Sequence, residues 1–240
     1  MIDIHTHILY DVDDGSDTID ESVAILKYAK KNGVTDVVLT PHYVEAAEYD
    51  DEKIKENFNV LKEKIEKERI DIKLHLANEV AIYGNVYSVL ADKRINTIAN
   101  SRYMLIEFPM STDVSYVLDT IYEMKIKGIT PIIAHPERCE CFRKHIERIK
   151  EAVDEGALIQ CNTGSIMGTY GNTAKKIVKK LLKEKLVHFL ATDTHSIKNS
   201  RYEDLNKVQV EVEKMVGLYE KNKLFVYNAR KVLINEEVES

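Results

Sequence analysis

Histidine, aspartate and glutamate residues gather in a few short motifs of this 240-residue chain. The stretch DIHTHILYDVDDG, residues 3–15, places His5 and His7 two positions apart and then packs three aspartates into four positions. Imidazole and carboxylate groups are ligands for divalent cations and also acid–base catalysts. More of them follow in the motifs TPH, NEV, LIEFP, AHPER and TDTH, namely His42, Glu79, Glu107, His135, Asp193 and His195.

The elements that position these residues alternate between strand and helix. Runs rich in Val, Ile and Leu predict seven buried strands, at residues 1–7, 34–42, 71–80, 103–109, 129–136, 157–162 and 187–193. Helical spacing of apolar residues predicts helices at 18–33 and 51–69, and segment 81–100 is expected to be a loop with a short helix around 86–91. This alternation indicates a parallel α/β fold. No linker, repeat or low-complexity tract divides it, so residues 1–240 are expected to form one domain.

Six of the seven predicted strands end in a His, Asp or Glu. The carboxyl ends of parallel strands meet at one edge of a barrel or doubly wound sheet, where sites are built. Side chains alternate along a strand, so Asp3, His5 and His7 are predicted to face the mouth of the barrel together. Ile2 and Ile4 would then face the other way.

Eight imidazole and carboxylate groups in one place would repel or desolvate one another, and bound cations remove that cost. Mixed donors without thiolate suit Mn²⁺, Fe²⁺ or Zn²⁺ in an open hydrolytic site better than a closed structural zinc. The ligands are too many for one ion. Two or three ions bridged by carboxylate are therefore expected, an arrangement that clamps phosphoryl groups.

Each motif alone also has a simpler interpretation. DVDDG is common as a solvated turn in which Gly15 supplies a left-handed backbone position, and HTH, TPH and AHPER are individually weak signals. Their joint occurrence at successive strand ends favours the metal site. The remaining histidines do not fit this pattern: His75 is expected in the interior, and His145 and His188 are expected to be structural or exposed.

Composition and cysteine usage limit the other functions. A net charge of −6, from 34 basic and 40 acidic residues, gives no reason to expect nucleic acid or anionic membrane as a partner. No apolar run approaches the about 20 residues that span a bilayer, and no signal-peptide pattern is present, so a cytoplasmic location is expected. Cys139, Cys141 and Cys161 form no disulfide framework. None has the arginine six positions later that a cysteine-based tyrosine phosphatase needs, although Cys139, Cys141 and His145 could make an adventitious metal contact.

The motifs DIHTHIL…DVDDG, TPH, NEV, LIEFP, AHPER and TDTH together resemble the polymerase-and-histidinol-phosphatase (PHP) superfamily. Within it, SRYMLIEF and YNARKVL make residues 1 to about 232 similar to the capsule-type (CpsB-like), manganese-dependent bacterial tyrosine-protein phosphatases. That resemblance implies a distorted TIM-like (β/α)7 barrel of the PHP type.

The resemblance also implies the site residues. Arg138 and Arg201 would bind the phosphate, and His42 and Asp14 are both candidates for the general acid. The loop CNTGSIMGTYG, residues 161–171, is not fixed across the family and is given no catalytic role. A trinuclear manganese site would be held by His5, His7, Asp14, His42, Glu79, Glu107, His135, Asp193 and His195.

Several functions are compatible with such a site. The subfamily resemblance implies metal-dependent hydrolysis of phosphotyrosine on a bacterial tyrosine autokinase that controls capsular or extracellular polysaccharide synthesis. The alternative is a histidinol-phosphatase-like enzyme for small phosphomonoesters, using the same ions. A non-enzymatic barrel is less favoured because structural metal sites usually close with four ligands, and the charge disfavours a nuclease. The choice among Mn²⁺, Fe²⁺ and Zn²⁺ and the presence of a homo-oligomer stay open.

Overall fold

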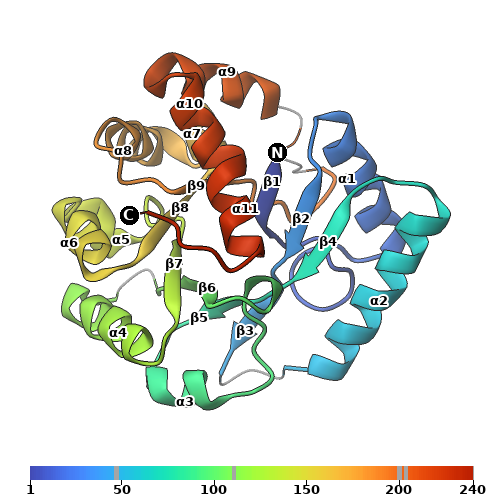
Figure 1. Ribbon diagram of the computed structural model, residues 1–240, viewed down its shortest axis with the longest axis horizontal. Coiled ribbons are helices and arrows are strands. Elements are labelled where there is room, and N and C mark those ends of the chain that lie inside the picture. The colour runs from blue at the N-terminus through green and yellow to red at the C-terminus, as the bar shows by residue number, and fades with distance from the viewer. Residues whose placement is uncertain (46–48, 110–111, 199–201, 203–204, 240) are drawn as a thin grey trace.

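Parallel strands form a ring that helices surround (Figure 1). The computed structural model describes residues 1–45, 49–109, 112–198, 202 and 205–239. The strands are β1 (Ile2–Thr6), β2 (Asp36–Leu39), β3 (His42–Val44), β4 (Lys73–Leu76), β5 (Glu79–Ala81), β6 (Tyr103–Glu107), β7 (Thr130–Ala134), β8 (Leu158–Asn162) and β9 (Phe189–Ala191). The helices are α1 (Ile19–Lys31), α2 (Asp51–Lys67), α3 (Val86–Ala91), η1 (Ile98–Asn100), α4 (Val114–Ile126), α5 (Glu140–Lys144), α6 (Glu147–Glu155), α7 (Thr163–Met167), α8 (Gly171–Lys183), α9 (Leu205–Val216), α10 (Leu218–Asn222), η3 (Lys223–Tyr227) and α11 (Asn228–Leu233).

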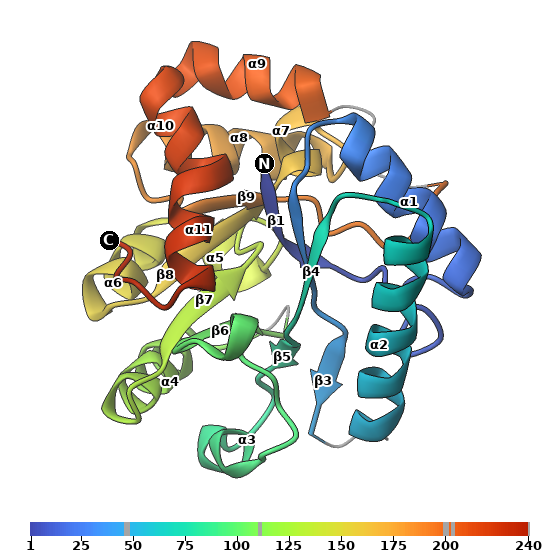
Figure 2. The same cartoon turned by 45° about the vertical axis from the view of Figure 1, so that its right-hand side comes forward.

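The described strands occupy seven positions around the ring, because β2 with β3 and β4 with β5 each fill one position. One sheet has the order β1-β2-β4 and the other the order β3-β5-β6-β7-β8-β9, and all pairs are parallel. Two of the predicted strands pass from one sheet to the other, β2 into β3 and β4 into β5 (Figure 2). A parallel bridge between Thr6 and Thr194 connects β1 to the chain after β9. The predicted (β/α)7 barrel is thus confirmed in a distorted form.

Side-chain hydrogen bonds bridge the two points where a predicted strand is divided, between β2 and β3 and between β4 and β5. Pro41 has no N–H to donate to a ladder. Thr40 compensates beside it, because its Oγ1 accepts from Thr6 N and donates to Thr6 O, both at 3.1 Å. Asn78 Nδ2 donates to Pro41 O at 2.9 Å across the second break. His42 and Glu79, predicted at strand ends, therefore begin the short strands β3 and β5.

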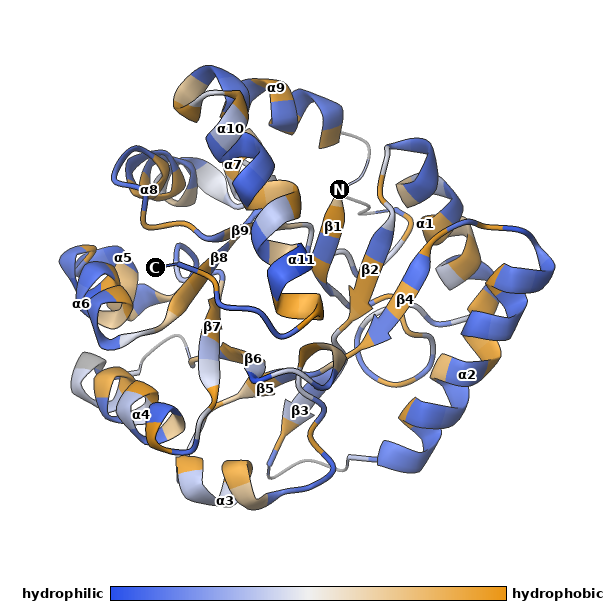
Figure 3. Cartoon of the chain, in the orientation of Figure 1, coloured by the Kyte–Doolittle hydropathy of each residue, from blue (hydrophilic) through white to orange (hydrophobic). Residues whose placement is uncertain are grey.

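Apolar side chains pack on both sides of the ring. The larger cluster lies between the strands and the outer helices, and the smaller one lies inside the ring under α11. In Figure 3 many strand residues are hydrophobic, whereas most residues of α2 are hydrophilic. The helix pattern of the sequence is confirmed for α1, α2 and α3.

Strand β1 departs from the regular alternation expected of it. Ile2 and Ile4, predicted to face away, belong to the inner cluster together with α11. Asp3 does not join the two histidines, because its carboxylate accepts from Tyr202 Oη at 2.8 Å. The register of β1 against β2 shifts between Asp3 and Thr6. Such an irregularity re-aims the following side chains, so the predicted alternation is wrong although both histidines still reach the mouth.

The histidines outside the site occupy three different environments. His75, expected in the interior, is only half-buried and lies 3.2 Å from Asp36 Oδ1. His145 is exposed and lies near Glu147. His188 is buried, and its Nδ1 accepts from Ile159 N at 3.0 Å.

His188 is expected to make the fold sensitive to acid. Burial and the charge of Lys223 lower its pKa to about 4, against 6.5 for the free side chain. Between those two pH values the unfolded chain takes up a proton that the folded chain does not, so stability falls as the pH falls. At pH 4.5 this costs about 2–3 kcal/mol. In His188→Asn the new side chain can still accept from Ile159 N but does not titrate. Between pH 7 and 4.5 its free energy of unfolding, measured in urea, should fall by about 2–3 kcal/mol less than that of the wild type. Equal falls in the two proteins would contradict the expectation.

Candidate metal centre

Glu79 lies at the centre of the candidate site. Its Oε2 is 3.1 Å from Nε2 of His5 and 3.0 Å from Nε2 of His7. The same oxygen is 3.3 Å from Nδ1 of His42, and Oε1 is 2.9 Å from Nε2 of His135. Four imidazoles from three parts of the chain therefore surround one carboxylate that is 1% exposed.

Among the described residues, four overlapping groups of donors lie within reach of single cations. The ligand atoms of each group lie within 4.8 Å of one another. His5, His7, His42 and Glu79 each belong to two groups, so neighbouring cations would share ligands. Their role as ligands remains a prediction, but the structure brings together all nine predicted residues: His5, His7, Asp14, His42, Glu79, Glu107, His135, Asp193 and His195.

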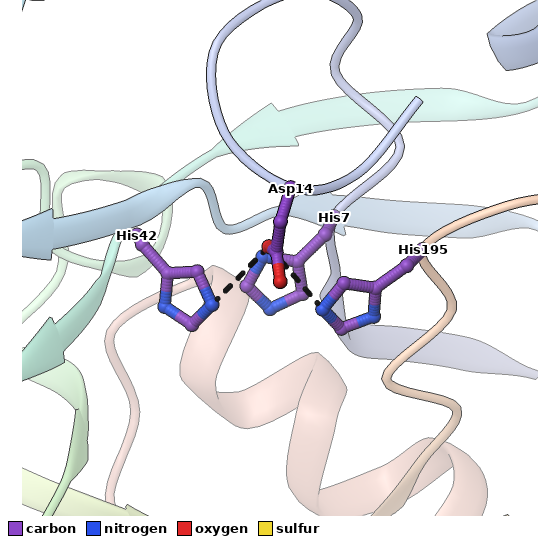
Figure 4. A group of neighbouring side chains, drawn as sticks. All are labelled: His7, Asp14, His42 and His195. Carbon is purple, nitrogen blue, oxygen red and sulfur yellow. Dashed lines mark ion pairs between the residues drawn. The ribbon is translucent and has the colours of Figure 1, made fainter. Parts of the chain in front are cut away.

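One of these groups forms the open side of the site (Figure 4). Oδ1 of Asp14 lies 3.5 Å from Nε2 of His42 and 3.6 Å from Nε2 of His195. The Asp14 side chain is 70% exposed, and those of His42 and His195 are 28% and 30% exposed. The ring of His7 stacks behind them, 4.2 Å from the ring of His195. A substrate in solution can therefore approach this group.

Arg138 extends the site with a positive charge. Its Nη1 donates to Asp193 Oδ2 at 2.7 Å, and its guanidinium lies 4.6 Å from the centre of the Tyr170 ring. The side chain is 36% exposed, so its remaining donors are accessible to an oxyanion. Arg201, the second predicted phosphate ligand, lies outside the described residues.

Two site residues have an unusual backbone. His135 follows β7 with φ 32°, and Asp193 follows β9 with φ 54°. Residues other than glycine rarely adopt positive φ, and where they do the conformation is often held in place at a functional site. In both cases the turn brings the side chain towards Glu79 or Arg138.

The buried charges shift one another strongly. Burial alone lowers the pKa of His7 and His135, but hydrogen bonds to Asp13 and Glu79 outweigh it. The pKa of His7 is raised well above 6.5 and that of His135 to about 9. Burial raises the pKa of Glu79, but the neighbouring His5 and His135 bring it well below 4.5. The carboxylate thus needs positive charge beside it, which protons or cations can supply.

The DVDDG loop is fixed to the site by a residue that the sequence analysis did not single out. Asp13 Oδ2 accepts from Nδ1 of His7 at 2.8 Å and from the backbone N of His42 at 3.1 Å. A bond of this kind sets which ring nitrogen is free to bind a metal. Gly15 is not in the left-handed region, contrary to expectation. It is needed instead for close approach, since an added Cβ would lie 1.6 Å from His7 O.

Gly15→Ala is expected to move this loop out of the site. The His7 backbone follows β1 directly and its N–H donates to Thr194 O at 2.9 Å, so we expect Asp13 and Asp14 to shift instead. Loss of the Asp13 bond to His7 should weaken manganese binding about 10–100-fold, as measured by competition with a chelating dye. Gly84→Ala is the matched control, because its nearest neighbour would be 4.0 Å away. Equal affinity in the two variants would show that the loop does not support the site.

The cysteines lie apart from this chemistry. Cys139, Cys141 and Cys161 are buried and free. The two neighbouring thiols are 2.9 Å apart. Among the described residues, no candidate metal group contains a cysteine, so the adventitious contact with His145 is not formed.

Comparison with known proteins places the chain in a family. The family model described as "Capsular polysaccharide synthesis, CpsB/CapC" matches residues 1–234. The chain belongs to the CpsB/CapC family. This confirms the resemblance seen in the sequence, and 1–234 covers nearly all of the 240 residues.

Members of the CpsB/CapC family are similar along their whole length. The CapC protein of Staphylococcus aureus is 36% identical over 99% of this chain and 93% of its own. The tyrosine-protein phosphatase CpsB of Streptococcus pneumoniae is 33% identical over 98% of this chain and 99% of its own. A crystal structure from work on YwqE of Bacillus subtilis and CpsB of S. pneumoniae, described as metal-dependent tyrosine phosphatases, superposes with a TM-score of 0.92 at 30% identity, covering 100% of this chain and 96% of that one.

More distant structures share the fold alone. Histidinol phosphate phosphatase from Lactococcus lactis matches with a TM-score of 0.57 at 12% identity over 89% of this chain and 93% of its own. This likeness agrees with the PHP-type barrel inferred from the sequence.

Proposed function

We propose that this protein is a metal-dependent protein-tyrosine phosphatase. The observation that carries the proposal is the set of imidazoles and carboxylates around Glu79, with Arg138 at its edge. The names of the full-length relatives support phosphotyrosine as the group that is hydrolysed. The chemistry is a phosphoric monoester hydrolysis without a cysteine nucleophile.

The donor set fits two or three divalent cations. His5, His7, Glu79 and Asp193 lie innermost, with the other predicted ligands around them. Nitrogen and carboxylate donors without thiolate favour Mn²⁺, with Fe²⁺ or Zn²⁺ as alternatives. When bound, such cations act as Lewis acids towards a phosphoryl group and make water nucleophilic near neutral pH.

The protein's own residues orient the substrate. Arg138 is held by Asp193 and Tyr170, so its free donors can grip two phosphate oxygens and stabilise charge on them. Arg201 is proposed to assist it. A phenol leaves readily because its pKa is near 10. His42 and Asp14, at the exposed side, are the proposed sources of any proton that the leaving group takes.

The proposed substrate is a bacterial tyrosine kinase that regulates capsular or extracellular polysaccharide synthesis. The family description and the relatives' names support this choice. A cytoplasmic location is proposed with it. Within the described part of the chain, no helix has the length and apolar character to cross a bilayer.

The test is phosphate release from a phosphotyrosyl peptide by protein stripped of metal and then given Mn²⁺, Fe²⁺, Zn²⁺ or Mg²⁺. We expect the highest rate with Mn²⁺ and no release above background from His135→Ala. Arg138→Ala should raise KM and also lower kcat, because it removes both a phosphate contact and the charge that stabilises the transition state. A higher kcat/KM on histidinol phosphate than on the peptide would favour the small-molecule alternative and overturn the proposal.

A further inference from the structure

Strand β8 brings no imidazole or carboxylate to the candidate site. It supplies Gln160 and Asn162 instead, two residues apart on one face and both fully buried. Buried side-chain amides are nearly always hydrogen-bonded, because an unpaired buried polar atom costs free energy. Their partners therefore show what they do.

The carboxamides connect two predicted metal ligands. Gln160 Oε1 lies 2.9 Å from Nδ1 of His5, and Gln160 Nε2 donates to Asn162 Oδ1 at 2.8 Å. Asn162 Nδ2 donates to Asp193 Oδ2 at 2.7 Å. The result is an unbroken buried chain of hydrogen bonds from an imidazole of β1 to a carboxylate after β9.

The carboxylate fixes the direction of the whole chain. Asp193 can only accept, so Asn162 must turn its NH₂ towards it and its oxygen towards Gln160. Gln160 must then present its own NH₂ to Asn162 and its oxygen to His5. The Nδ1 of His5 must in turn carry a hydrogen, which leaves Nε2 on the side of Glu79, 3.1 Å from Oε2.

The same chain divides the two oxygens of Asp193. Oδ2 accepts from both Asn162 and Arg138, each at 2.7 Å. Oδ1 is left free of these donors and lies 3.5 Å from Nε2 of His5 and 3.7 Å from Nε2 of His7. Only one oxygen of Asp193 therefore faces the space between the imidazoles.

The position of Asn162 is itself fixed. Glu137 Oε1 accepts from the backbone N of Asn162 at 2.9 Å and from Ser165 Oγ at 2.7 Å. Glu137 is fully buried and stands directly before Arg138 in the chain. The end of β8 is thus tied to the loop that carries the phosphate-binding arginine.

We propose that Gln160 and Asn162 are positioning residues for the metal centre, which orient His5 through Nδ1 and Asp193 through Oδ2. This inference rests on the proposed metal-dependent function. Neutral carboxamides suit the task because each is both donor and acceptor. A carboxylic acid in place of Asn162 would put a second acceptor against Asp193, and an apolar residue would leave buried polar atoms without partners.

The first test measures Mn²⁺ affinity without substrate, by competition with a chelating dye. Gln160→Leu and Asn162→Asp are each expected to weaken binding about 10–100-fold. Asn228→Asp is the matched control, since Asn228 is a buried carboxamide that bonds to His188 O, outside the site. It should keep wild-type affinity even if it lowers Tm. Wild-type affinity in both Gln160→Leu and Asn162→Asp would overturn the proposal.

The second test uses ¹⁵N NMR of metal-free protein to determine which nitrogen of the His5 ring carries a hydrogen. Nδ1 should carry a hydrogen in the wild type and lose its protection from exchange in Gln160→Leu. Absence of that hydrogen in the wild type would overturn the proposal even if the variants failed to fold. Neither test uses phosphatase activity, so a wrong substrate assignment would leave both results interpretable.

Discussion

Glu79→Gln is expected to lower kcat/KM for a phosphotyrosyl peptide roughly 10³-fold or more, equivalent to about 4 kcal/mol of lost transition-state stabilisation. The substitution keeps the shape of the side chain and removes the charge that four imidazoles contact. Glu79 belongs to two of the candidate groups and would be shared by two cations, so elemental analysis of the purified variant should find fewer cations per chain than in the wild type.

Glu63→Gln makes the same chemical change on an exposed side chain of α2 and should alter neither activity nor metal content. Retention of full metal content by Glu79→Gln, with activity within about tenfold of the wild type, would mean that Glu79 does not bridge the cations.

Removal of the cations is expected to abolish activity, to lower Tm and to let protons bind to the site in their place. A cation at 100 times its Kd stabilises a protein by about 2.7 kcal/mol, so adding Mn²⁺ back should raise Tm by roughly 5–10 °C for a chain of this size. The raised pKa values of His7 and His135 mean that both rings are positively charged, with a hydrogen on each nitrogen, at pH 7 in metal-free protein. A cation needs the lone pair of one ring nitrogen, so its binding should release one proton from each ring, about two in all.

Calorimetry in two buffers of different ionisation enthalpy measures this release. The sign follows from the shifts: manganese affinity falls as the pH is lowered below the raised pKa values, because protons compete better for the rings. The His135→Gln variant should release about one proton fewer than the wild type. Binding without proton release at pH 7 would contradict the charge states described for the site.

The location of the site could be predicted from the sequence, but the irregularity of β1 and the division of two strands could not. Ligand-type residues such as His135 and Asp193 come one or two positions after strands, and parallel strands bring their carboxyl ends together, so convergence could be inferred. The irregularity in β1 could not, because a register shift depends on which strand lies alongside. The breaks at Pro41 and Asn78 also depend on partners far along the chain.

The supporting residues were missed for a related reason. Gln160 and Asn162 lie in a run that is typical of any buried strand. Their carboxamides carry no charge and match no ligand motif, so nothing in the sequence indicates a role at the site. Asp13 was visible in DVDDG, but only the folded loop shows that it bonds to His7 while Asp14 faces the open group. Gly15 was read as a turn residue because its close contact with the His7 carbonyl is not encoded locally.

The most direct test of a shared metal centre is anomalous X-ray diffraction at the manganese absorption edge from crystals of the Mn²⁺-loaded protein. We predict two or three anomalous peaks beside Glu79, each within bonding distance of at least three of the nine predicted ligands. A lone peak elsewhere in the molecule, or none above noise in crystals of active protein, would contradict the assignment.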